Sequence, residues 1–307
     1  MGYQERDWDV VDHQAYNLLP DEKYSQFKGP RHENLKKGEY IACVGAAQTF
    51  GCYTDKPFAT LLQQRLETPV LNLGVGGASA EFFLLRPALL EYINNARFAI
   101  VQVMSGRSVG NSRFTTNRGK CIYTPVGGGD PLRAEKAFQK VLEEPDGEKT
   151  VARLAAENRE NWVNVTNRLL DSIRVPTILL WISVRKPAYE DNYTSISNLF
   201  NKFPQLINEP TLKRVIAHSD EYVECISDRN MPYTLINRFT GEVAKIDPKA
   251  ASRRDTDPPR DPTIPVKTIS TGGYYPSPEM HEDAADLLEP ICRKLLGQTA
   301  PLATAQM

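Results

Sequence analysis

The sequence predicts an α/β fold of three layers, in which helices cover both faces of a central parallel sheet. Short apolar runs alternate along the chain with segments of helical periodicity. Several of these runs are apolar at nearly every position, as strands buried on both faces are. Two stretches interrupt the alternation, at about 105–148 and 245–273, and predict a scaffold with long insertions.

The expected strands lie at 39–45, 68–74, 97–104, 176–183 and 221–227, and the first of them is a continuous apolar run that ends in Gly45. The expected helices repeat apolar residues with a period near 3.6 and lie at 56–66, 78–96, 149–173 and 277–297. Pro87 stands inside the second helical segment and predicts a kink or a break there. Trp181, inside the fourth strand, is expected to pack in the core.

The remaining segments suggest one domain with a polar strap before it. Residues 1–37 are polar and include the aromatic residues Tyr3, Trp8 and Tyr16 and a basic stretch at 28–37, which is expected to be a solvated face. Residues 38–307 then form one α/β domain. The insertion at 105–148 is rich in Gly, Arg and Asn, and that at 245–273 in Pro, Asp and Arg. Both are expected to be mobile surface loops or a lid over the site.

Composition excludes several classes of protein. The chain has 307 residues, 41% of them hydrophobic, and a formal net charge of −1, so no global field attracts nucleic acid. No apolar run reaches the roughly 18 residues of a membrane helix. The five cysteines show no metal-binding spacing, and Cys43, Cys225 and Cys292 are expected to be buried free thiols. We therefore expect a cytoplasmic protein with no metal site.

The stretch VGAAQTFG (44–51) follows the first expected strand and opens a helix. Ligands of parallel sheets bind where strands end, because N–H groups and helix ends converge there. The stretch resembles block I of the SGNH (GDSL-type) hydrolases, GDSxTxG, with Gly45, Thr49 and Gly51 matching. Ala46 falls on the aspartate of that family and Ala47 on its nucleophilic serine.

Three further stretches resemble later blocks of the same superfamily in the same order. NLGVGGAS (72–79) is similar to block II, and Gly77 falls on the glycine of the oxyanion hole. MSGRSVGNSRF (104–114) departs from the family pattern GxND, since Ser108 stands at the asparagine position and Asn111 follows three residues later. YYPSPEMH (274–281) matches the general-base histidine with His281 but places Pro278 on the aspartate.

The resemblance covers about 40–114 and 274–297. Taken whole, it points to an uncharacterised bacterial SGNH-like family that lacks the block I serine. That family is distantly similar to capsule polysaccharide biosynthesis proteins that bind coenzyme A. The resemblance therefore implies an SGNH/flavodoxin-like scaffold with a role in polysaccharide biosynthesis.

The missing serine argues against a standard esterase, because an acyl-enzyme needs a nucleophile beside a base. We expect instead a group transferase, acyl or sulfuryl, that acts on a glycan or lipid-linked hydroxyl acceptor. His281 would deprotonate that hydroxyl, with Gln48, Gly77 and Asn111 as its catalytic partners. The donor, coenzyme A or a 3′-phosphoadenosine-type molecule, would be held by Gly45, Ala47, Arg107, Ser108 and Arg113.

Two other classes stay open. One is a hydrolase whose nucleophile is Ser79, Ser105 or a water activated by His281. The other is a non-catalytic protein that binds an anionic ligand at the same loops. Thr49 is expected to bond the turn in either case. His218, at the end of a helix, is expected to be a surface cation.

Overall fold

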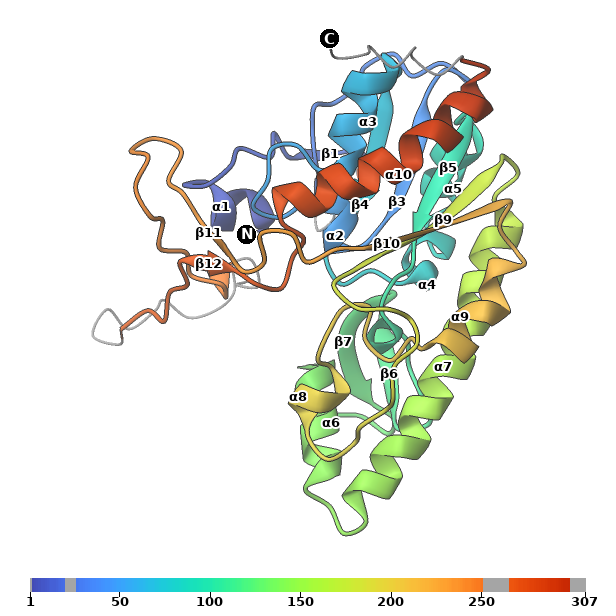
Figure 1. Ribbon diagram of the computed structural model, residues 1–307. Helices are drawn as coiled ribbons and strands as arrows, with labels where there is room; N and C mark the ends of the chain where they lie inside the picture. Colours follow the sequence, from blue (N-terminus) through green and yellow to red (C-terminus); the bar gives the residue numbers. More distant parts are fainter. Residues whose placement is uncertain (1, 20–25, 251–264, 299–307) are drawn as a thin grey trace.

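A five-stranded parallel sheet forms the centre of the molecule. The computed structural model describes residues 2–19, 26–250 and 265–298, and Figure 1 shows the sheet with the chain wound around it. The strand order is β10-β9-β5-β3-β4, and every neighbouring pair is parallel. The strands are β3 (Ile41–Gly45), β4 (Val70–Gly74), β5 (Phe98–Gln102), β9 (Thr177–Ser183) and β10 (Glu221–Ile226). The predicted fold class and all five predicted strands are confirmed.

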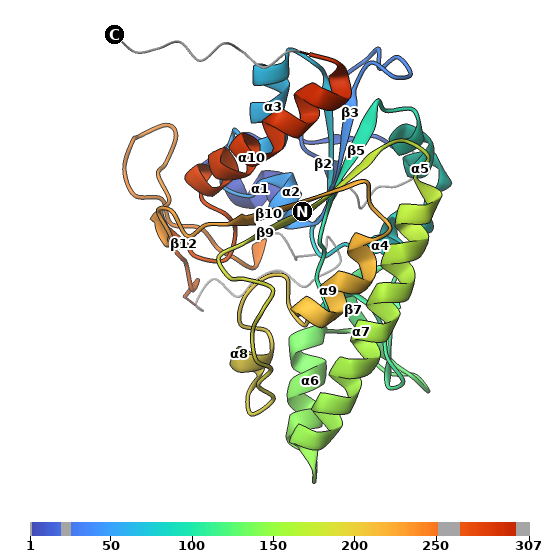
Figure 2. The same cartoon turned by 45° about the vertical axis from the view of Figure 1, so that its right-hand side comes forward.

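Helices cover both faces of this sheet (Figure 2). α3 (Phe58–Leu66) and α10 (Pro278–Leu296) pack together on one face. The other face carries α4 (Ala80–Leu84), α5 (Pro87–Asn94), α7 (Gly147–Ser172) and α9 (Glu209–Ile216). α4 ends before Pro87 and α5 begins at it, which confirms the predicted break. No helix within the described residues is both long enough and apolar enough to cross a bilayer.

The tryptophan and the three cysteines that were predicted to lie in the core have buried side chains. Trp181 lies within β9, and its side chain has no exposed surface. The thiols of Cys43, Cys225 and Cys292 are free and buried in the layer between the sheet, α3 and α10.

His218 follows α9 and contacts Asp171 at the surface, with 2.8 Å between Nδ1 and Oδ1.

The first insertion is a folded lobe rather than a loop. After the short 3-10 helix η1 (Gly106–Ser108), the chain forms a three-stranded antiparallel sheet and then a helix. These elements are β6 (Phe114–Asn117), β7 (Lys120–Pro125), β8 (Leu132–Arg133) and α6 (Ala134–Leu142). Phe114, Tyr123 and Phe138 form an aromatic core in this lobe, closed by the first half of α7. The expectation of a mobile loop is therefore wrong over most of 105–148.

The second insertion is ordered where it is described. β11 (Tyr233–Thr234) pairs with β12 (Thr271–Gly272), and Ile246 bridges to Ile269. Residues 251–264, the centre of the expected Pro-rich loop, lie outside the described residues.

The short helix α8 (Ile196–Leu199) packs against α6.

The N-terminal segment packs against the block I loop. It contains α1 (Tyr3–Asp7), β1 (Tyr16–Asn17) and β2 (Gln26–Phe27), and the last two pair as antiparallel strands. The ring of Tyr3 lies 5.0 Å from that of Phe50, which belongs to α2 (Ala47–Phe50). Lys28 is 3% exposed, so the prediction of a solvated face fails at this residue.

Candidate functional site

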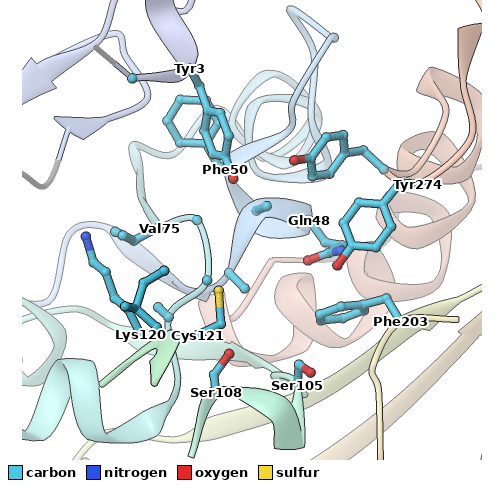
Figure 3. Close-up of a pocket in the computed structure, with 18 of the residues that line it drawn as sticks. Tyr3, Gln48, Phe50, Val75, Ser105, Ser108, Lys120, Cys121, Phe203 and Tyr274 are labelled. Atoms are coloured by element: carbon cyan, nitrogen blue, oxygen red, sulfur yellow. The ribbon is translucent and has the colours of Figure 1, made fainter. Parts of the chain in front are cut away.

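A cavity of about 540 Å³ opens at the carboxyl ends of the central strands. It lies beside β3 and β5, which are neighbours in the sheet although β4 separates them in the chain, so it occupies the topological switch point. Its lining comes from α1, the loops after β3, β4 and β5, β7, and the segment before α10 (Figure 3). Its volume lies within the range typical of small-molecule sites.

The block I loop forms part of the cavity wall, and a buried glutamine holds that loop in place. Gln102, near the end of β5, accepts three hydrogen bonds at its side-chain oxygen. The donors are the backbone N–H of Ala46 (3.0 Å), the backbone N–H of Thr49 (3.1 Å) and the Thr49 hydroxyl (2.6 Å). Thr49 therefore bonds the turn, as predicted. Gln102 was missed by the sequence reasoning because its strand position alone gives no sign of these contacts.

Gln48 brings an unpaired donor to the cavity. Its side chain is 2% exposed, and its oxygen accepts a long hydrogen bond of 3.5 Å from the Gln102 amide. Its amide nitrogen Nε2 is buried and has no hydrogen-bond partner among the described residues. An unpaired buried donor costs about 1–3 kcal/mol, which an oxygen of a bound ligand would recover.

The block II glycine lies against a thiol. Gly77 has a φ of +73°, and a Cβ built on it would meet the Cys121 sulfur at 2.6 Å. The Cys121 N–H donates to the Gly77 carbonyl at 3.0 Å, which fixes β7 against this turn. The N–H of Gly77 has no protein acceptor in the described part of the chain. Cys121 is partly exposed, whereas the other four thiols are buried.

Arg107 lies in the cavity wall, and its positive charge is paired with a carboxylate. Its guanidinium forms an ion pair with Glu135 at the start of α6 and donates to the Tyr274 hydroxyl at 2.7 Å. Ser105 accepts a hydrogen bond from the Arg107 backbone N–H at 3.2 Å and begins the turn that carries it. Arg133 and Lys120 add two further cations to the lining.

A second arginine closes the cavity from α1. The Arg6 guanidinium packs over the rings of Tyr3 and Tyr53, each at 4.5 Å, and over Tyr275 at 5.2 Å. Its charge is balanced by Asp7, which accepts a hydrogen bond from Nη2 at 2.9 Å. Arg6 and Tyr275 are 269 positions apart in the sequence, so no local sequence pattern signals their contact.

Asp7 also belongs to a buried hydrogen-bonded chain that runs through His13 to Lys28 behind the cavity. It contacts His13 Nε2 at 2.8 Å, and His13 Nδ1 lies 2.7 Å from the Lys28 ammonium nitrogen. Lys28 also donates to the Thr54 carbonyl at 2.6 Å. Burial lowers the pKa of His13 to about 4 and that of Lys28 to about 8. His13 and Lys28 lie outside the cavity lining, so this chain supports the wall without reaching a ligand.

His281 does not reach the cavity. Its side chain is fully buried between α10 and α3, where Nδ1 accepts a hydrogen bond from the Phe58 N–H at 3.2 Å. Burial lowers the pKa of His281 to about 3, so the ring stays neutral. The residues spaced at +3, +4, +7 and +11 along α10 are apolar and fully buried: Ala284, Ala285, Leu288 and Cys292. His281 therefore shares the core face of the helix, and the expectation that it acts as general base is not met by this geometry.

Three more predicted residues lie outside the cavity lining. Asn111 is buried and donates to Asn158 at 2.8 Å, which secures the insertion lobe. Arg113 forms a bidentate ion pair with Glu144 at the surface. Gly45 leaves room for Thr49 and Gln102, whose side-chain oxygens would lie 2.2 and 2.4 Å from an added Cβ.

The other predicted residues meet at the cavity. Gln48, Gly77, Ala47, Arg107 and Ser108 all line it. Ser105 lines it as well, whereas Ser79 is fully buried and donates to the Gly119 carbonyl at 3.0 Å. None of the histidines at 13, 32, 218 and 281 lies among the described lining residues. A serine–histidine pair of the esterase type is therefore not assembled there.

Comparison with known proteins gives one family match. A model for a domain of unknown function (DUF6473) matches residues 1–118, which include the block I and block II loops and η1. No curated protein matches the chain.

Several solved structures are similar to this one at low identity. A carbohydrate esterase family 2 enzyme with a carbohydrate-binding domain, from Corynascus thermopiles (Myceliophthora fergusii), is 11% identical, with a TM-score of 0.35 over 89% of this chain and 73% of that chain. A protein from Lactobacillus plantarum is 13% identical, with a TM-score of 0.36 over 85% and 99%. A carbohydrate esterase described as having divergent catalytic and non-catalytic binding functions is 11% identical, with a TM-score of 0.35 over 86% and 67%. Likeness of this degree says nothing of what this chain acts on.

Proposed function

We propose that this chain is an acyltransferase that binds its acyl donor in the strand-end cavity. The Gln48 amide nitrogen carries the proposal, because it is a buried donor without a partner at the cavity wall. The unpaired N–H of Gly77 lies on the neighbouring loop. Two preorganised donors at one cavity suit a carbonyl oxygen that gains negative charge during acyl transfer.

The charged side chains that line the cavity favour acyl transfer over sulfuryl transfer. A sulfuryl donor needs several uncompensated cations around its anionic oxygens. Here Arg107 is paired with Glu135, so that the wall near Gln48 offers a neutral amide instead of a free guanidinium. Arg133 is exposed at the edge of the cavity, and a charged tail of the donor, such as the phosphates of coenzyme A, would bind there.

The aromatic side of the cavity suits a sugar acceptor. Tyr3, Tyr274 and Tyr275 line it, and each combines an apolar ring with a hydroxyl. Such side chains pack against the apolar faces of a sugar and hydrogen-bond its hydroxyl groups. We therefore keep a glycan-type hydroxyl compound as the acceptor. His281 lies in the core and does not line the cavity, so it is not the base that accepts the proton of that hydroxyl.

One observation favours a second candidate, which is ligand binding without turnover. No histidine lines the described cavity, and the carboxylate of Glu135 is engaged by Arg107. A protein that only binds a donor-like ligand would use the same Gln48 amide. Turnover of the bound donor separates the two candidates.

A thermal-shift series on the purified protein tests the binding step. The series contains coenzyme A, acetyl-CoA, adenosine 3′,5′-bisphosphate and sulfate. A ligand at 100 times its dissociation constant adds about 2.7 kcal/mol, which is a shift of a few degrees. We expect acetyl-CoA to shift the wild type, and Gln48→Met to lose most of that shift. Gln139→Met, at an exposed position of α6, is the matched control and should keep it.

The outcome also distinguishes the donor classes. A shift with adenosine 3′,5′-bisphosphate that exceeds the shift with acetyl-CoA would contradict the acyl assignment and favour sulfuryl transfer. An equal shift in Gln48→Met and wild type would remove Gln48 from the site. Consumption of acetyl-CoA, measured as free thiol released in the presence of sugar acceptors, would then exclude the binding-only candidate.

A further inference from the structure

We infer that Cys121 is the nucleophile of this site and carries the acyl group as a thioester between donor and acceptor. The inference rests on the proposed acyltransferase function and adds a residue that the block resemblance does not supply. Ala47 leaves the cavity without the hydroxyl of the hydrolase loop. Cys121 comes instead from the folded insertion, on β7, and lines the same cavity.

The position of the thiol supports this role. Cys121 is held at the block II turn by its own N–H, which donates to the Gly77 carbonyl at 3.0 Å. A bridge between Ala78 and Lys120 secures the same junction. Figure 3 shows the Cys121 sulfur pointing into the space that Gln48 also lines. The thiol is therefore placed by backbone pairing rather than by a mobile side-chain contact.

Gln48 supplies an observation that does not depend on the cysteine. The Gln48 side chain lines the cavity, and its buried amide nitrogen has no hydrogen-bond partner among the described residues, so it is available to donate to an acyl oxygen. An acyl carbonyl held by that amide and by the Gly77 N–H would present its carbon to the cavity. The Cys121 sulfur lies at Gly77, on the adjoining wall. In the proposed arrangement the acyl carbon binds between the Cys121 thiol and these two donors.

The reaction balances without a further reagent. In the first step the Cys121 sulfur bonds to the acyl carbon, and the bond from that carbon to the donor sulfur or oxygen breaks. The thiol proton leaves with the donor fragment, which departs as free thiol or alcohol. In the second step the acceptor hydroxyl oxygen bonds to the same carbon, the carbon–Sγ bond breaks, and the hydroxyl proton returns to Cys121.

Trapping the acyl group on the protein tests the inference. The full chain is incubated with acetyl-CoA or with p-nitrophenyl acetate, quenched in acid, and examined by intact and peptide mass spectrometry. We expect one acetyl group on Cys121, removed by neutral hydroxylamine as thioesters are. Cys121→Ala should lose it, and Cys225→Ala, which removes a buried thiol elsewhere, should keep it. Gln48→Met should acylate about 100- to 1,000-fold more slowly.

The variant Cys121→Ser controls for misfolding of Cys121→Ala. Cys121→Ser keeps the size of the side chain, and any acetyl group it accepts should resist neutral hydroxylamine because it is an oxygen ester. Acetylation of a different residue, or wild-type acetylation in Cys121→Ala, would overturn the inference. So would the absence of an adduct from both reagents while iodoacetamide still alkylates Cys121.

The thermal shift separates failure of this inference from failure of the proposed function. If acetyl-CoA shifts the melting temperature of both wild type and Cys121→Ala, and sugar acetylation continues in the variant, the acyltransferase stands and the thioester does not. If acetyl-CoA gives neither a shift nor an adduct, both fail together.

Discussion

His281 has a fully buried side chain, so its replacement is expected to change how the stability of the protein depends on pH. If it served as the general base, replacing it would remove activity and leave the pH dependence of stability largely unchanged. In the structure it is a core residue whose Nδ1 accepts the Phe58 N–H, the first backbone donor of α3. The informative change is His281→Gln, because glutamine keeps an acceptor for that N–H and does not titrate.

The size of the effect follows from the pKa values. An unfolded histidine has a pKa of 6.5, whereas burial lowers that of His281 to about 3. Between these values the unfolded chain binds the proton and the folded chain does not, so the free energy of unfolding decreases as the pH falls. From pH 7 to pH 5 the linkage amounts to about 2 kcal/mol for this one residue.

Urea unfolding at pH 7 and at pH 5 measures this quantity. We expect the wild type to lose about 2 kcal/mol more than His281→Gln between the two pH values. His13 titrates in both proteins, so its contribution cancels in the difference. His218→Gln, at the surface, controls for the loss of a histidine as such. Equal losses in wild type and His281→Gln would refute the assignment of His281 to the neutral core.

Two further predictions concern the buried polar groups around the cavity. Asp7→Asn removes the carboxylate that pairs with both Arg6 and His13, and we expect a loss of about 3–5 kcal/mol in urea unfolding because a buried charge is left unpaired. Asn158→Leu removes the amide that donates to the Tyr123 hydroxyl and to two carbonyls in the insertion lobe. It should cost about 2–3 kcal/mol and increase amide hydrogen exchange in β7, whereas unchanged exchange would contradict the role of Asn158 in holding the lobe.

The scaffold was predictable because its signals are local. The strands β3, β4, β5 and β9 are buried at every position, and their largely apolar sequences mark them as strands covered on both faces. The edge strand β10 also has exposed positions. The break at Pro87 is local in the same way, since proline lacks the N–H that a continuous helix needs. The insertion lobe was not predictable by these means. Its core joins Phe114, Tyr123 and Phe138, which come from three short elements surrounded by polar residues.

The site was predictable where a strand end fixes it and unpredictable where a distant segment completes it. Gln48, Gly77 and Arg107 follow three strands whose carboxyl ends meet, and all three reach the cavity. His281 was assigned from its place in a motif, although its spacing from the small and apolar residues of α10 already marks the buried face of that helix. Cys121 gave no signal, because only the pairing of the insertion with the block II turn brings it there.

The alanines of the block I loop are consistent with this arrangement. In a serine hydrolase the loop carries the nucleophile, and the surrounding contacts have to position it. Here the side-chain oxygen of Gln102 accepts hydrogen bonds from Ala46 and Thr49, and these bonds hold the loop without a polar side chain at residue 47. Ala47 then presents only a methyl group, which leaves space above the strand ends. In the proposed mechanism Gln48 of this loop acts together with Gly77 and Cys121 of the neighbouring walls, and residue 47 takes no part.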